Sequence, residues 1–149
     1  MREEIIGKID SQTEVDLMNK TIELFSKIEG LKARGGCSQE DIQVAEQKLG
    51  LSFPEEYKNY LLKYGSVRFN GVELCGLNAT GYLNVVEATE QEKSVNTSFP
   101  DKMFVIEDLG VDAKLIIGDE KGNIYLLQRD KKRLVCASFL EYVEKCMYR

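Results

Sequence analysis

The sequence predicts an α+β fold: N-terminal helices, then an antiparallel meander of about six strands, then a C-terminal helix. Two observations carry this prediction. Up to Gly65 and again after Ser138, apolar residues recur every three or four positions, whereas between these points the spacing changes to every second position. The chain has 149 residues, and no repeat, linker or low-complexity segment divides it. We therefore expect a single domain over residues 1–149.

The first predicted helix runs from Val15 to Ile28, after a polar lead-in of about a dozen residues that is loose or partly helical. Thr13 and Asp16 are spaced as in a helix cap, and Gly30 is placed to end the helix. Its apolar stripe consists of Val15, Met18, Ile22, Phe25 and Ile28.

Two further helices are predicted before the strands. Ser38 and Asp41 form a capping-box pattern at the start of the second helix, and Gly50 ends it. Pro54 suits the start of the third, because its missing N–H would have no partner there, and Gly65 ends that helix. The expected buried stripes are Ile42, Ala45 and Leu49 in the second helix and Tyr57, Tyr60, Leu61 and Tyr64 in the third. We expect these tyrosines to pack in and around the core rather than to stack on nucleic-acid bases.

The strand region begins with a hairpin. Asn70 and Gly71 predict a type I′ turn between strands 67–69 and 72–74, since both turn residues need a positive φ. The other predicted strands are 82–86, 103–106, 114–117, 124–128 and 134–137, with a turn at 118–123 and a helix or ordered loop over 87–98. Ser138 caps the last helix, on which Leu140, Val143 and Met147 are expected to face inward.

The charge balance bears on the kind of partner. Twenty Lys and Arg residues against twenty-five Asp and Glu residues give a net charge of −5, which disfavours a general nucleic-acid binder and favours basic partners. One basic run, residues 129–133, is either a solvated hairpin turn or a nucleic-acid contact. No apolar run has the length of a membrane span, and the first residues lack the apolar core of a secretion signal. We expect a soluble, cytoplasmic protein that binds neither membranes nor, directly, nucleic acid.

The residues offer few catalytic groups. The chain has no histidine, which excludes histidine-based triads and histidine-ligated metals. Cys37, Cys75, Cys136 and Cys146 form no Cys-x-x-Cys pair, so we expect buried reduced thiols. The loop 76–81 lacks the Gly-Lys-Ser/Thr ending of a phosphate-binding loop. The acids at 107, 108 and 112 and at 119 and 120 are either solvated turn residues, ligands for Mg²⁺ or an acid–base pair. We expect no catalytic residue, metal or cofactor.

Residues 38–65 combine a capped helix that carries a glutamate, the Phe53-Pro54 pair, an aromatic-led helix and a glycine turn. This combination resembles the N-terminal signature of the SUKH superfamily, although Phe53 stands where leucine or isoleucine is commoner. The superfamily contains the yeast cell-wall-synthesis regulators of Smi/Knr type and many bacterial immunity proteins. Segments 104–110, 122–125 and 137–143 are similar to the family's later strands and closing helix. The resemblance implies a curved antiparallel sheet flanked by helices, with residues 1–36 as an N-terminal helical extension.

The resemblance also implies a function without catalysis. Bacterial members look like immunity proteins that bind and block a secreted toxin domain, often a nuclease, whereas yeast-type members act as regulatory interaction modules. We therefore expect an antitoxin that binds a cognate toxin domain. A regulatory or scaffolding module is the alternative, and an enzyme that uses carboxylates or a metal is a third reading.

An acidic domain of this kind can occupy the basic groove with which a nuclease grips phosphate. We expect the binding face to contain acids at the end of the sheet and on the segment 87–98, with an aromatic or basic anchor beside them. The alternative for each residue is an ordinary solvated side chain. The expected partner-binding residues are Arg68, Tyr82, Glu87, Glu90, Glu92, Glu107, Asp108 and Asp112.

Overall fold

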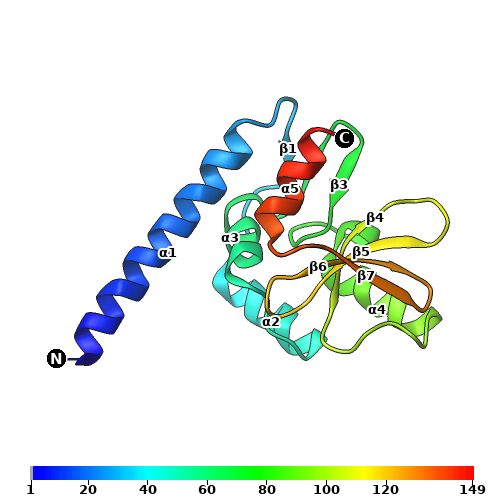
Figure 1. Ribbon diagram of the computed structural model, residues 1–149, viewed down its shortest axis with the longest axis horizontal. Helices are drawn as coiled ribbons and strands as arrows, with labels where there is room; N and C mark the ends of the chain where they lie inside the picture. Colours follow the sequence, from blue (N-terminus) through cyan, green and yellow to red (C-terminus); the bar gives the residue numbers. More distant parts are fainter. Residues whose placement is uncertain (1) are drawn as a thin grey trace.

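The computed structural model describes the backbone of residues 2–149 and the side chains from residue 12 onward (Figure 1). Helices and strands follow one another in the α+β order that the sequence predicts. The elements are α1 (Arg2–Ser26), β1 (Lys32–Ala33), α2 (Gln39–Leu49), α3 (Glu55–Tyr64), β2 (Val67–Phe69), β3 (Val72–Leu74), η1 (Gly81–Leu83), α4 (Val85–Val95), β4 (Phe104–Asp108), β5 (Lys114–Gly118), β6 (Ile124–Gln128), β7 (Lys131–Cys136) and α5 (Phe139–Met147).

Within residues 2–149 the strands form two antiparallel sheets, of order β1-β2-β3 and β4-β5-β6-β7, and not the one meander that the spacing predicts. The split occurs at residues 82–86, which are a 3₁₀ turn and the start of α4 instead of a strand. The Asn84 side chain accepts hydrogen bonds from the Val86 and Glu87 N–H groups and so begins a helix in the middle of this apolar run.

The other local signals are largely confirmed. Ser38 and Asp41 form the capping box of α2, and Asn70 and Gly71 both have positive φ in the β2–β3 turn. Of the basic run, the first residues form the β6–β7 turn, and the run continues into β7 from Lys131. All four cysteines are free, and the three beyond Cys37 are buried.

Helix α1 differs from its prediction at both ends. It is helical from Arg2, so Thr13 lies inside it rather than at its cap, and it ends at Ser26, before Gly30. Only its last turns pack on the body: Phe25 is buried against the Tyr64 ring at 4.5 Å between centroids, whereas Val15 is 54% exposed. The earlier turns extend away from the body in Figure 1.

The two sheets meet at residues 74–76, which we call the 74–76 junction. The Cys75 N–H donates to the Ile106 carbonyl of β4 at 2.7 Å. From α3, the fully buried Tyr57 hydroxyl donates to the Cys75 carbonyl (2.8 Å) and that of Tyr60 to the Leu74 carbonyl (3.0 Å). The expectation that these tyrosines pack in the core is confirmed, and their hydroxyls also satisfy buried carbonyl groups.

The last residue of the junction, Gly76, connects it to α4. Its N–H donates to the Leu83 carbonyl, and its own carbonyl accepts from the Val85 N–H. A Cβ atom at Gly76 would lie 1.8 Å from the Gly65 carbonyl oxygen, so the two backbones leave no room for a side chain. These backbone contacts connect the start of α4 to the junction, which is itself bonded to β4.

Helix α5 packs beside the four-stranded sheet through Phe139, Tyr142, Val143 and Cys146. Val143 faces inward as expected, but Leu140 and Met147 are only half-buried at the edge of this face.

Glu107 connects β4 to α5. It is 3% exposed and accepts hydrogen bonds from the Tyr142 hydroxyl and from both terminal nitrogens of Arg149, at 3.2 and 2.6 Å. This ion pair raises the pKa of the Arg149 guanidinium above its usual value. A β-bulge in β4, between Val105 and Glu107, turns the Glu107 side chain toward this side of the sheet.

We predict that Gly76→Ala lowers the free energy of unfolding by more than about 3 kcal/mol, since the added methyl group overlaps a backbone carbonyl. Gly110→Ala is the matched control, because Gly110 has a positive φ but nothing within 4 Å of an added Cβ. It should cost about 1 kcal/mol through backbone strain alone. Urea unfolding followed by circular dichroism measures both. Equal losses in the two variants would contradict the close approach at Gly76.

We predict that Arg149→Ala lowers the free energy of unfolding by about 1–2 kcal/mol. The change leaves the Glu107 carboxylate buried without its cation, and the 42% exposure of the Arg149 side chain reduces the loss below that of a fully buried pair. Lys27→Ala, which breaks an exposed pair with Glu23, should cost less than about 0.5 kcal/mol. If Arg149→Ala lowers the free energy of unfolding no more than Lys27→Ala in the same urea assay, the Glu107–Arg149 ion pair contributes little to stability.

Candidate functional site

A cleft of about 360 Å³ opens between the η1–α4 segment and strands β4 and β5. Tyr82 and three acids, Glu87, Glu92 and Asp108, surround it, and the buried side chains of Val105 and Leu115 form its floor. We call this site the acidic cleft. It joins apolar walls to a few convergent polar groups, which is the usual composition of a binding site.

The wall formed by α4 is held in place by two features of its sequence. The Asn84 cap fixes where the helix begins, and the helical period places Glu87, Ala88 and Glu92 on one face toward the cleft. Also on α4, the buried Thr89 hydroxyl oxygen accepts a hydrogen bond from the Val105 N–H at 2.9 Å. The acids of α4 are thus presented by a helix that is fixed to the sheet.

The opposite wall depends on the bulge in β4. In a regular strand, residues three apart point to opposite faces. The bulge between Val105 and Glu107 changes this alternation, so Val105 and Asp108 both line the cleft while Glu107 faces α5. Asp108 lies directly opposite Leu115 in the ladder, which completes the floor.

The acids of the cleft have no internal cation. Within the part of the chain whose side chains are described, no lysine or arginine lies within 4 Å of the Glu87, Glu92 or Asp108 carboxylates. Burial and, second, the negative charge of Asp108 raise the pKa of Glu92. A cation placed in the cleft would relieve both the burial penalty and the repulsion between these carboxylates.

Tyr82 stands at the rim of the cleft and is 63% exposed. Its hydroxyl donates to a Glu73 carboxylate oxygen at 3.0 Å, and this hydrogen bond is the main cause of its raised pKa. The charges of Arg68 and Arg34 act in the opposite direction on the same pKa, so Tyr82 lies between the acids of the cleft and a basic patch. Tyrosine is one of the residues enriched among the anchors of protein interfaces.

The structure therefore brings together Tyr82, Glu87, Glu92 and Asp108 out of the eight residues expected from the sequence. The other four lie elsewhere.

Two of these four are exposed near the cleft. Arg68 lies on β2 and lines a separate hollow with Arg34. Glu90 points from α4 into the groove beside α2.

The remaining two have different surroundings. Asp112 belongs to the β4–β5 loop, where its carbonyl accepts from the Gln128 side chain at 2.9 Å. Glu107 is buried in its ion pair with Arg149, so its carboxylate does not reach the surface on which it is expected.

Some residues of the site are not among those expected from the sequence. Ala88, Val105 and Leu115 come from three elements, and only the fold brings them to one floor. Glu73 and Arg34 flank Tyr82 from β3 and the segment after β1. The one available signal is the Asn84 cap, from which the helix, and so the common face of Ala88 and Glu92, follows.

Two other features bear on the site's chemistry. Among the side chains from residue 12 onward, histidine, cysteine and acidic residues nowhere gather in groups of three or more suited to a metal ion. Within the described residues, no helix combines the length and apolar character needed to cross a membrane. What the acidic cleft offers is a place for a cation, with an apolar floor for its aliphatic stem.

Comparison with known proteins agrees with this fold. A model of the SUKH_5 family, described as SMI1-KNR4 cell-wall, matches residues 15–148. The chain is also 39% identical over 52 residues to the Bacillus subtilis (strain 168) protein named "Uncharacterized protein YnaB". That match covers 34% of this chain and 36% of YnaB, so it spans about a third of the relative's length. Because the family model matches nearly the whole chain, the protein belongs to the SUKH_5 family of SMI1-KNR4 type.

Proposed function

We propose that this protein is an immunity protein, or antitoxin, that binds and neutralises a cognate polymorphic toxin domain with nuclease activity. Membership of the SMI1-KNR4 family supports a role in protein–protein interaction. The observation that carries the proposal is the acidic cleft, whose carboxylates have no cation of their own within the described residues.

The proposed recognition starts from charge. A nuclease presents lysine and arginine side chains where it holds phosphate, and these are the groups that the cleft would accept. One such side chain can lay its aliphatic stem against Val105 and Leu115 and place its cation between Glu92 and Asp108. In this position the immunity protein occupies groups that the nuclease needs for its substrate, so binding and inhibition follow from the same contact.

The net charge of −5 adds to this recognition. Long-range attraction between an acidic inhibitor and a basic enzyme raises the rate of encounter, and the effect weakens as salt screens the charges. Tyr82 is exposed at the rim near Arg68 and Arg34. Its ring would add an apolar contact with the partner to the charge attraction of the cleft.

A regulatory module is the second candidate, and the words "SMI1-KNR4 cell-wall" in the description of the matching family favour it. The acidic cleft would then hold a basic segment of a cellular protein rather than a toxin. Co-expression separates the two functions. The test is co-expression with the C-terminal domain that the neighbouring gene encodes. Rescue of growth from a toxic domain, with a copurified complex, supports immunity, whereas a folded toxic domain that still kills contradicts it.

We predict that the double variant Glu92→Lys/Asp108→Lys binds the cognate toxin domain at least about 100-fold more weakly, because two attractive contacts become repulsive. The matched control is Asp101→Lys/Glu144→Lys, which changes the net charge equally at two exposed acids outside the cleft. Titration calorimetry measures both, and circular dichroism verifies the fold. If both double variants lose the same affinity, only net charge matters and the cleft is not the site.

We predict that toxin binding strengthens as pH rises through the pKa of Glu92, which lies above the usual range for a glutamate. The cation needs the ionised carboxylate, so protons compete with the partner, and Glu92→Gln should remove this part of the pH dependence. The raised pKa also means that ionisation of Glu92 destabilises the free protein. At neutral pH, Glu92→Gln should therefore unfold at a higher urea concentration. If Glu92→Gln weakens toxin binding but leaves the pH dependence of binding unchanged, Glu92 is not the group whose ionisation controls it.

A further inference from the structure

Strand β7 is an open edge of the four-stranded sheet. Among the strands of residues 2–149 it pairs with β6 and with no other, whereas β4, at the opposite edge, is bonded to the 74–76 junction through Ile106. Figure 1 shows β7 along the outside of the sheet. An open edge exposes backbone N–H and C=O groups that can pair with a further strand.

Three apolar side chains, which we call the apolar row, line a hollow of about 310 Å³ beside α5 and reach this edge: Ile116, Leu126 and Val135. Ile116 of β5 pairs with Leu126 of β6, and Leu126 pairs with Arg133 of β7. Val135 lies two residues farther along β7, at a register shift where it has no partner in β6. Leu126 and Val135 are only half-buried. A strand added next to β7 would place its alternate side chains in continuation of this row and cover it.

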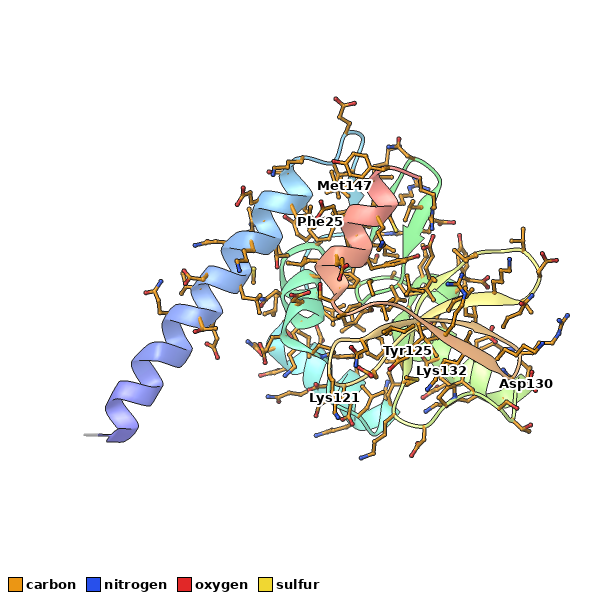
Figure 2. The ribbon with its side chains drawn as sticks, in the orientation of Figure 1. Phe25, Lys121, Tyr125, Asp130, Lys132 and Met147 are labelled. Carbon is orange, nitrogen blue, oxygen red and sulfur yellow. The ribbon has the colours of Figure 1, made fainter. Side chains whose placement is uncertain are left out.

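The edge is also basic. Lys131, Lys132 and Arg133 are exposed on β7, in a chain of net charge −5. Among the described side chains, no carboxylate lies within 4 Å of the charged groups of these three residues. The Lys132 ammonium lies 4.7 Å from the centroid of the Tyr125 ring, and Figure 2 shows both on the hairpin, with Asp130 at its tip.

The hollow is basic at other points of its rim as well. Lys114 of β5 and Lys145 of α5 line it together with Arg133. Arg149 also lines it, with its guanidinium paired to the buried Glu107. The apolar row is therefore flanked by cations on the edge strand, on the sheet and on the helix, and of those that line the hollow only Arg149 has a carboxylate within 4 Å among the described side chains.

We infer that β7 is a docking edge for an extended, acidic segment of a partner protein, which pairs with β7 as an added strand. Backbone hydrogen bonds to β7 supply affinity, carboxylates beside Lys131 and Arg133 supply charge complementarity, and an apolar side chain beside Val135 extends the row. This site differs from the acidic cleft in sign and lies at the other edge of the same sheet. It does not depend on the proposed immunity function.

The same basic run is one of the features that suggest nucleic-acid contact. A phosphate backbone would use the cations but neither the open backbone groups of β7 nor the apolar row, and the net charge of the protein opposes it. Lysines on an edge strand also serve to keep the strand unpaired. These two alternatives give different results in the experiment below.

The probe is a short capped peptide in which glutamate alternates with valine, titrated into the labelled full-length protein and followed by NMR. We expect shifts confined to residues 131–136 and the hollow, with slowed hydrogen exchange at β7 amides, as strand addition requires. A peptide with lysine in place of glutamate should bind at least about tenfold more weakly. No binding of the glutamate peptide would mean that the cations only keep the edge unpaired, and would overturn the inference.

Two further measurements sharpen the test. The double variant Lys131→Glu/Arg133→Glu should bind the glutamate peptide at least about tenfold more weakly. The matched control Lys20→Glu/Lys63→Glu, at exposed lysines on α1 and α3, should change this affinity less than about twofold. Equal weakening in both variants would overturn the assignment to β7. A single-stranded oligouridylate is the nucleic-acid probe: if it shifts the β7 resonances and the glutamate peptide does not, the edge is a nucleic-acid contact instead.

Discussion

One backbone hydrogen bond links the two sheets of this protein, and two tyrosine hydroxyls of α3 bind the segment that donates it. Tyr57 and Tyr60 are fully buried and donate to the carbonyls of the 74–76 junction, while the Cys75 N–H donates to Ile106 in the other sheet. Gly76 then fixes the start of α4 through backbone contacts. Because α4 and β4 are the walls of the acidic cleft, the interactions that join the sheets also set the geometry of the cleft.

Much of this fold follows from local sequence signals. The α2 capping box, the Asn70-Gly71 turn and the β5–β6 hairpin form as predicted, because each is decided by a few neighbouring residues. The errors have a different origin. Residues 82–86 have the composition of a strand, but Asn84 caps a helix there. The division into two sheets depends on long-range packing, which apolar spacing does not contain.

The site was predictable only in part. Acids on the 87–98 segment and at the end of β4 are visible in the sequence, and Glu87, Glu92 and Asp108 do converge. The sequence does not reveal the β4 bulge, which directs Asp108 into the cleft and its neighbour Glu107 into a buried ion pair with Arg149. One extra residue in the strand therefore places two adjacent acids in different environments, one in the cleft and one buried. The composition of the sequence does not show which acid is which.

The cleft and the β7 edge give one sheet two edges of opposite charge, and we propose that the acidic edge receives the partner's cations. The most direct measurement is hydrogen exchange of the protein alone and in complex with its cognate toxin domain. We expect protection to concentrate in η1, the first turns of α4 and the β4–β5 strands. A stable complex that leaves these segments unprotected, with protection elsewhere, would contradict the account.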